Sequence, residues 1–274
     1  MDQVSAISDP YREAQGFGGT IEYVRDGVPR CTPPLKDTTD LSVLGTPDPL
    51  QSERMLDRVD AIRAFKEQLG GEYSILGWIE GPAAEAADLR DVTNFLMDLV
   101  MNEEFACELM DRCIEVGIEF ARAQIEAGAD TIGVGDAIAS QVSFDIYEKL
   151  ILPREERLFT AIREMGGLIK LHICGNITHL LPGIAQLPID VIDIDHMVDI
   201  VAAREAVGDK VAITGNIDPA SAVRTGTPDA IHKAIQEIYA RIGNPYMPNA
   251  GCEIPSGTPE ENLKALCEPI PYQA

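Results

Sequence analysis

Short apolar runs alternate with longer amphipathic stretches along most of the chain. The apolar runs suit buried strands, and the stretches between them carry apolar residues at helical spacing. Strands are predicted at Tyr73–Ile79, Asp130–Val134, Leu168–Ile173, Val191–Ile194 and Val211–Thr214, with a sixth that ends near Met247–Ala250. Helices are predicted between Ser52 and Gly70 and at Glu103–Ala127, Phe144–Met165 (kinked or restarted at Pro153), His179–Gln186, Val201–Val207, Asp229–Ile242 and Pro259–Cys267. This alternation predicts repeated βα units and a parallel sheet.

The first 52 residues differ from the rest of the chain in composition and in hydrophobic pattern. They are rich in Pro, Gly, Thr and Asp and show no sustained helical or strand period. Residues 20–24 and 28–31 flank Arg25-Asp26-Gly27, and an Asp-Gly pair between two such segments predicts a hairpin. We therefore expect a single domain over residues 1–274, with an irregular part and a hairpin at 1–52 and the βα units at 53–274.

Charge and composition narrow the classes of partner. The chain has 45 Asp and Glu against 22 Lys and Arg, a formal net charge of −23, which disfavours nucleic acid. No apolar run approaches the roughly 18 residues of a membrane-spanning helix, and the start lacks the features of a signal peptide. Six cysteines scattered over the chain fit reduced thiols better than a disulfide framework. A cytoplasmic protein without membrane or nucleic-acid partners is therefore expected.

Polar and metal-binding residue types gather directly after the predicted strands. They are Glu80, Asp136, His172, Cys174, Asp195, His196, Asn216, Asp218 and Cys252. Parallel α/β folds build their sites at the carboxyl ends of the strands. The position of these residues, as well as their type, therefore points to a site at that edge.

A possible chelate is formed by His172, Cys174 and Cys252. The first two lie two residues apart at one strand end, so their side chains project to the same face, and Cys252 occupies the equivalent end of the last predicted strand. One His and two Cys are typical of a catalytic zinc with an open fourth position. Two thiolates leave the metal a weak Lewis acid that can still hold a substrate thiol as thiolate, which indicates alkyl transfer to a thiol. The other four cysteines are predicted to be packing or surface thiols.

The segments His172–Asn176, Gly215–Pro219, Asn249–Pro255 and Trp78–Pro82 resemble the uroporphyrinogen decarboxylase superfamily, and most closely its zinc-dependent methylcobamide:coenzyme M methyltransferase branch. The resemblance covers about residues 11–268 and implies a TIM-type (β/α)8 barrel. It also implies zinc ligation by His172, Cys174 and Cys252, with Glu80 and Asp136 as catalytic carboxylates that line the cavity. The implied reaction moves a methyl group from a methylated corrinoid on a partner protein to a zinc-activated thiol such as coenzyme M.

The sequence departs from this family at its N-terminus. Relatives carry helices and the first barrel strand ahead of the segment like Ser8–Gly18, and we expect this chain to lack them and to form an N-terminally truncated barrel. The corrinoid-binding pattern Asp-x-His-x-x-Gly is absent around Asp195-His196, so the corrinoid is expected on a partner. The acceptor (coenzyme M, homocysteine, another thiol or a pterin) and the oligomeric state stay open.

Three alternatives are retained. Uroporphyrinogen decarboxylation is disfavoured because the chain has no Arg-rich N-terminal segment, only Asp9 loosely matches the family's pyrrole-binding aspartate, and the net charge repels a polyanionic substrate. A corrinoid-dependent demethylase component is disfavoured because its zinc would act as a Lewis acid on the donor, and a zinc with two Cys ligands and one His ligand is a weak Lewis acid. A non-catalytic barrel would close its zinc with a fourth protein ligand, such as Glu80, Asp136 or His196.

Overall fold

The computed structural model of the chain describes residues 3–25, 27–267 and 269–270. The chain divides into two compact units, Met1–Ile169 and Lys170–Ala274. Seven parallel strands lie in the described residues, one fewer than a closed eight-stranded barrel requires. Among the described helices, none is both long and apolar enough to cross a membrane.

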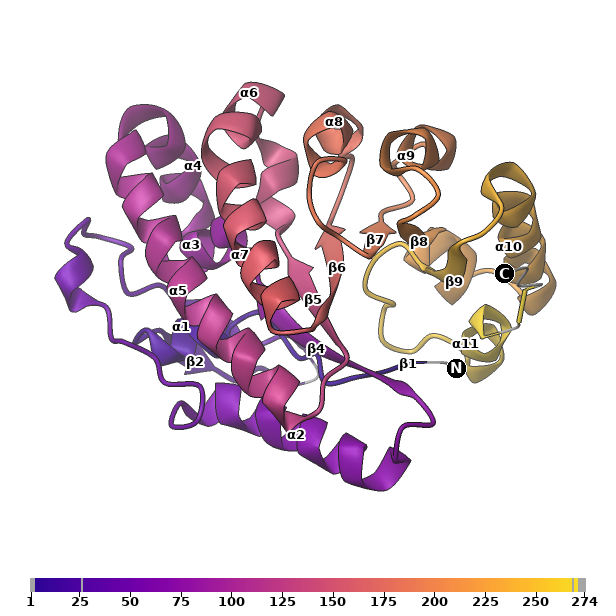
Figure 1. The fold of residues 1–274 in the computed structure, drawn as a ribbon, viewed down its shortest axis with the longest axis horizontal. Coiled ribbons are helices and arrows are strands. Elements are labelled where there is room, and N and C mark those ends of the chain that lie inside the picture. Colours follow the sequence, from indigo (N-terminus) through magenta and orange to yellow (C-terminus); the bar gives the residue numbers. More distant parts are fainter. Residues whose placement is uncertain (1–2, 26, 268, 271–274) are drawn as a thin grey trace. The chain divides into compact units, whose positions relative to one another are not determined.

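The first unit is built on three parallel strands in the order β1–β4–β5, with bounds Gln3–Ser5, Ser74–Glu80 and Thr131–Gly135 (Figure 1). Its helices are α1 (Arg12–Gly16), α2 (Glu53–Leu69), α3 (Pro82–Arg90), α4 (Val92–Met101), α5 (Glu103–Ala127), α6 (Phe144–Ile146) and α7 (Leu152–Glu164). The long α5 packs against α2, α3, α4 and α7. All five residues of β5 are buried, as an apolar strand covered on both faces requires.

The second unit continues the pattern with β6 (Leu168–Ile173), β7 (Val191–Ile194), β8 (Ala212–Ile217) and β9 (Tyr246–Ala250), each parallel to the next. The helical segments that follow these strands are η4 (Thr178–Leu180) with α8 (Leu181–Ile184), α9 (Ile200–Val207), η5 (Pro219–Arg224) with α10 (Pro228–Ile242), and α11 (Glu260–Leu266) (Figure 1). The predicted βα repeats and parallel strands are thereby confirmed. The predicted bounds of β6, β7 and α5 are also those of the structure.

The N-terminal part contains the predicted hairpin in a shorter form. Strands β2 (Thr20–Glu22) and β3 (Arg30–Thr32) pair antiparallel, while Asp26 of the predicted turn lies outside the described residues. A short 3-10 turn, η1 (Leu41–Val43), follows. Ahead of Ser8, where we expected no strand, β1 pairs with β4.

The helix predicted at Phe144–Met165 is interrupted. A π-helical segment, η3 (Tyr147–Ile151), separates α6 from α7, and Pro153 lies in the first turn of α7. Proline is tolerated there because the first helical N–H groups have no partner within the helix. The predicted restart at Pro153 is confirmed.

Side chains complete β4 beyond the end of β1. The β1–β4 register stops at Leu76, two residues before Trp78. Gln124 of α5, fully buried, accepts from the N–H of Trp78 (2.8 Å) and donates to its carbonyl (3.1 Å). The N–H of Glu80 donates to Oε1 of Glu13 (3.0 Å). Two side chains thus form hydrogen bonds with backbone groups of β4 beyond its register with β1.

Candidate metal centre

Three ligand atoms converge at the strand ends of the second unit. His172 lies on β6, Cys174 directly follows it, and Cys252 comes two residues after β9. Nε2 of His172 is 3.0 Å from Sγ of Cys174 and 4.0 Å from Sγ of Cys252, and the two sulfurs are 3.6 Å apart. The sulfur separation is close to the edge of about 3.8 Å of a tetrahedron with zinc–sulfur bonds of about 2.3 Å. Of the described residues, these three form the group that could hold a metal ion.

Two glycines let the neighbouring strand ends approach closely. A Cβ on Gly251 would lie 2.7 Å from the backbone N of His196 and 2.9 Å from the carbonyl of Ile194. Gly215 has φ +93°, and a Cβ there would lie 2.5 Å from the same carbonyl. Any larger residue would push these loops apart. The close packing places Cys252, the next residue after Gly251, beside Cys174.

The imidazole of His172 is oriented by the next strand. Its Nδ1 lies 3.1 Å from the backbone carbonyl of Asp193, so the Nδ1–H donates there and Nε2 is left to face the two sulfurs. The Asp193 carboxylate in turn pairs with Nζ of Lys170 at 2.7 Å. A metal at Nε2 would replace the proton with which Nε2 donates to Cys252, and the Nδ1 hydrogen bond would hold the imidazole in the tautomer that a metal needs.

Hydrogen bonds favour the thiolate form of Cys252. Those from Cys174 and His172 lower the pKa of Cys252 to about 4, although partial burial opposes the shift. Burial lowers the pKa of His172, but its hydrogen bond to Cys252 and the charge of Asp193 outweigh that effect, so the pKa is raised. The site therefore stabilises negative charge on sulfur, which a metal cation would share.

The predicted catalytic carboxylate Glu80 lies in the first unit, as the last residue of β4. Its Oε1 accepts from Nη2 of Arg12 at 2.6 Å. Burial raises the pKa of Glu80 to about 7, with Arg12 opposing the rise. Nearby, Glu85 is buried with no hydrogen-bond partner for either carboxylate oxygen among the described residues, and burial together with the charges of Glu13 and Asp88 raises its pKa well above the usual range.

The second predicted carboxylate, Asp136, is also in the first unit and follows β5. Its oxygens accept from the backbone N–H groups of Ala83 (3.3 Å) and Ala84 (2.7 Å), in the first turn of α3. Burial raises the pKa of Asp136 to about 7, while these hydrogen bonds and one with Glu155 oppose the rise. Asp136 therefore caps a helix, and the catalytic roles of Asp136 and Glu80 stay predictions.

The Asp218-Pro219 pair starts a helical segment. The Asp218 carboxylate accepts from the N–H groups of Ala220 (2.8 Å) and Ser221 (3.0 Å), and Pro219 occupies the first position of η5. The polar residues that surround the candidate metal centre, Lys170 and Asp193, were not singled out from the sequence. The signal that could have found them is their spacing, because residues 170 and 172 share one face of β6.

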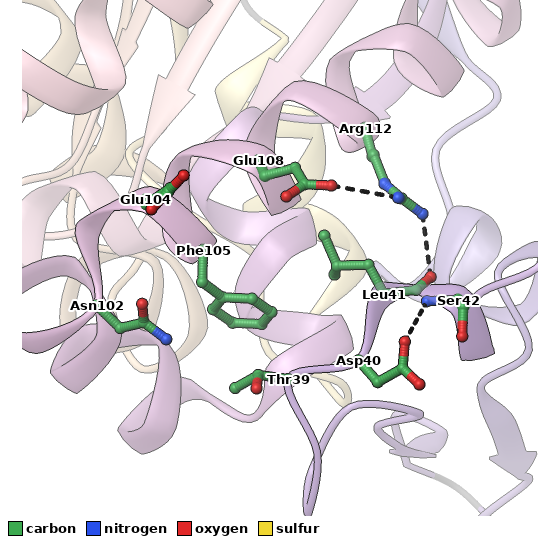
Figure 2. Close-up of a pocket in the computed structure, with 9 residues that line it drawn as sticks. All are labelled: Thr39, Asp40, Leu41, Ser42, Asn102, Glu104, Phe105, Glu108 and Arg112. Carbon is green, nitrogen blue, oxygen red and sulfur yellow. Dashed lines mark hydrogen bonds and ion pairs between the residues drawn. The ribbon is translucent and has the colours of Figure 1, made fainter.

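A second feature of the first unit is a surface pocket, drawn in Figure 2. It is lined by residues 39–42 around η1 and by residues at the start of α5. Arg112 is one of the lining residues and donates to the carbonyl of Leu41 (3.0 Å) while it pairs with Glu108 (3.3 Å). None of the predicted site residues lines this pocket.

The fold and the His/Cys/Cys group define a class: parallel βα proteins of the TIM-barrel kind with a candidate metal site at the strand ends. The uroporphyrinogen decarboxylase (URO-D) family model matches residues 1–270, and the chain belongs to that family. A solved methyltransferase from Methanosarcina mazei superposes with a TM-score of 0.88 at 25% identity, covering 97% of this chain and 79% of that one. The predicted family and fold class are thus confirmed.

The relatives of this chain include methyltransferases and decarboxylases. The chain is 32% identical over 222 residues to methylcobamide:CoM methyltransferase MtbA of Methanosarcina mazei, which covers 80% of this chain. It is 26% identical over 273 residues to uroporphyrinogen decarboxylase of Trichodesmium erythraeum, covering 96% of this chain and 75% of that protein. The chain spans 64% of the length of the M. mazei methyltransferase. It is homologous to both groups and carries a group that could bind a metal.

Proposed function

We propose that this protein is a zinc-dependent methyltransferase that moves a methyl group from a methylated corrinoid, carried by a partner protein, to a thiol such as coenzyme M. The observation that carries the proposal is the convergence of Nε2 of His172 with the sulfurs of Cys174 and Cys252, all within 4.8 Å of one another. The identity of 32% with a methylcobamide:CoM methyltransferase supports the same chemistry.

The donor set fits zinc. Zinc accepts sulfur and imidazole ligands in tetrahedral geometry, and three protein ligands leave a position for substrate. When bound, zinc would supply the positive charge that keeps an acceptor thiol deprotonated near neutral pH. The thiolates of Cys174 and Cys252 would offset that charge, and the imidazole of His172 would be a neutral third ligand, so the acceptor sulfur keeps electron density for attack on carbon.

The proposed reaction breaks the cobalt–carbon bond heterolytically. The acceptor thiol loses its proton, its sulfur forms a bond to the methyl carbon, and the electron pair of the broken bond stays on cobalt as cob(I)amide. The products are a thioether, cob(I)amide and a proton. Within the chain, Asp193 contributes by holding Nδ1 of His172 on its backbone carbonyl, which keeps Nε2 aimed at the sulfurs.

Uroporphyrinogen decarboxylation is the second candidate, because decarboxylases match almost the whole chain. Its substrate carries many carboxylates and needs free cationic side chains. Arg12 is 1% exposed and donates to the carbonyls of Ser8 and Asp9 and to Glu80. Arg54 pairs with Asp9. These N-terminal arginines are committed to internal acceptors, which favours methyl transfer.

The experiment is metal analysis of the purified, reduced protein beside Cys252→Ala and the control Cys107→Ala. Cys107 is a half-buried thiol on α5, outside the ligand group. We expect about one zinc per chain in the wild type and the control, and almost none in Cys252→Ala. Methylcobalamin with coenzyme M should yield the methyl thioether only with the first two proteins. Zinc and methyl transfer retained in Cys252→Ala would refute the site, and turnover of uroporphyrinogen instead would favour the second candidate.

A further inference from the structure

We propose that Asp195 is a positioning residue of the metal centre: its carboxylate holds the backbone that follows Cys174 and thereby sets where the Cys174 sulfur lies relative to Cys252. This inference rests on the proposed function, because it assigns Asp195 a role toward the same three ligands. It does not require Asp195 to touch the metal or the substrate.

The first observation is how the Asp195 carboxylate is used. Asp195 directly follows β7 and is 4% exposed. Its Oδ2 accepts from the N–H of Gly175 at 3.0 Å. Its Oδ1 accepts from the N–H of Met197 (3.3 Å) and lies 2.7 Å from Nδ1 of His196. A buried carboxylate that is engaged on both oxygens has little freedom to move, and hydrogen bonds to a charged acceptor are the stronger kind.

Asp195 holds Gly175, the residue at which the chain turns after Cys174. Gly175 has φ +87°, so the backbone changes direction immediately after the ligand. Glycine adopts this conformation easily, but it also makes the turn intrinsically flexible. The Asp195 carboxylate, as a fixed acceptor for the N–H of Gly175, restricts the backbone at this turn. The neighbouring Cys174 is thereby held in position.

The turn that carries Asp195 is itself fixed by Asn216. The Asn216 amide donates to the carbonyls of Asp195 (3.0 Å) and Val198 (2.9 Å). Asn216 has φ +69°, an uncommon conformation for a residue other than glycine, which persists only where surrounding contacts hold it. A Cβ placed on Gly251, the neighbour of Cys252, would come within 3.1 Å of the Asn216 backbone N. Hydrogen bonds and backbone packing thus connect both cysteine loops.

The substitution Asp195→Asn tests this connection with little change in shape. An amide has one acceptor oxygen where the carboxylate has two, so one of the donors now facing Asp195 meets an NH₂ group. Loss of a partner that orients metal ligands typically weakens metal binding by about 10- to 100-fold. We expect that range for the zinc affinity of Asp195→Asn.

The control is Asp199→Asn in the same loop. The exposed Asp199 caps α9 by accepting from the N–H groups of Val201 (2.8 Å) and Ala202 (3.4 Å), and in the described part of the chain its carboxylate does not hold Gly175. Zinc affinity is measured by competition with a chromophoric chelator, and Co(II) replaces zinc to record the sulfur-to-cobalt charge-transfer and d–d bands. Thermal unfolding reports loss of stability separately. A purely structural role would lower the melting temperature in either variant without changing the Co(II) spectrum.

The expected result is weakened zinc binding and altered Co(II) bands in Asp195→Asn, with Asp199→Asn like the wild type. Zinc affinity within about threefold of the wild type and an unchanged spectrum would overturn the inference and leave the proposed function standing. A wild type that binds no zinc overturns both. If Asp195→Asn does not fold, Asn216→Gly carries the same test, because glycine suits φ +69° while removing the amide.

Discussion

The buried ion pair beneath His172 gives a quantitative test of how this end of the sheet is stabilised. Nζ of Lys170 lies 2.7 Å from Oδ2 of Asp193, and the residues are 8% and 7% exposed. Asp193 stands in register with His172 on the neighbouring strand. Its other carboxylate oxygen, Oδ1, has no hydrogen-bond partner among the described residues. Replacing Lys170 by Met therefore leaves the carboxylate buried without its cation.

Removing one member of a buried pair costs about 3–5 kcal/mol, because the remaining charge is uncompensated. Methionine fills much of the space of the lysine stem, so little of this cost comes from a cavity. At this chain length about 1 kcal/mol corresponds to about 2 °C, so the melting temperature of Lys170→Met should fall by about 6–10 °C. The double variant with Asp193→Asn, which removes the charge, should recover most of the loss.

The assay is urea unfolding of the zinc-free protein, followed by circular dichroism, for the wild type, both single variants and the double variant. The Nδ1 of His172 contacts the backbone carbonyl of Asp193, which no side-chain substitution removes. Zinc content of the folded variants should therefore stay near that of the wild type. A loss below about 1 kcal/mol in Lys170→Met, or a double variant as unstable as that single one, contradicts the reasoning.

Three further predictions concern buried polar groups. Gln124→Leu leaves the backbone N–H and carbonyl of Trp78 without their side-chain partner and should cost about 2–4 kcal/mol in urea unfolding, whereas the exposed Gln186→Leu should cost under about 0.5. The pKa of Glu85 is raised in the folded protein, so its contribution to stability is full below the unfolded pKa of about 4.5 and is lost as pH rises through the folded pKa. Glu85→Gln should therefore raise the melting temperature at pH 8 and leave it unchanged at pH 4. No gain at pH 8 contradicts this prediction. With its pKa lowered to about 4, Cys252 of the metal-free, reduced protein should react with iodoacetamide about as fast at pH 6 as at pH 8, measured by peptide mass spectrometry, and a steep fall between these values would argue against a thiolate.

The local hydrophobic pattern of the sequence was sufficient to predict most strands and helices. The bounds of β6, β7 and α5 follow from hydrophobic period alone, because apolar runs and helical spacing are properties of neighbouring residues. The residue types and strand-end positions of His172, Cys174 and Cys252 were likewise legible in the sequence, since parallel strands bring their carboxyl ends to one edge.

Elements with weak local signals were missed. β1 is three residues long, too short to show a period. Helices α3 and α4 were not predicted, and α3 (PAAEAADLR) is buried on nearly every side, so it lacks the polar face by which a surface helix is recognised. The π-helical segment η3 is also without a sequence signature, because its extra residue per turn is accommodated by packing.

The sequence by itself determined the βα order and the ligand types, whereas only the tertiary structure decided how those ligands are supported. Cys174 and Cys252 lie 78 residues apart, and their sulfur separation of 3.6 Å depends on the close approach of the β7, β8 and β9 loops at Gly215 and Gly251. The fully buried Asp136 at a strand end is committed to α3, while Asp195, an equivalent residue at the end of β7, holds the turn after Cys174. Residue type and spacing do not distinguish these two aspartates, because each accepts a hydrogen bond from an N–H group of a segment distant in the chain.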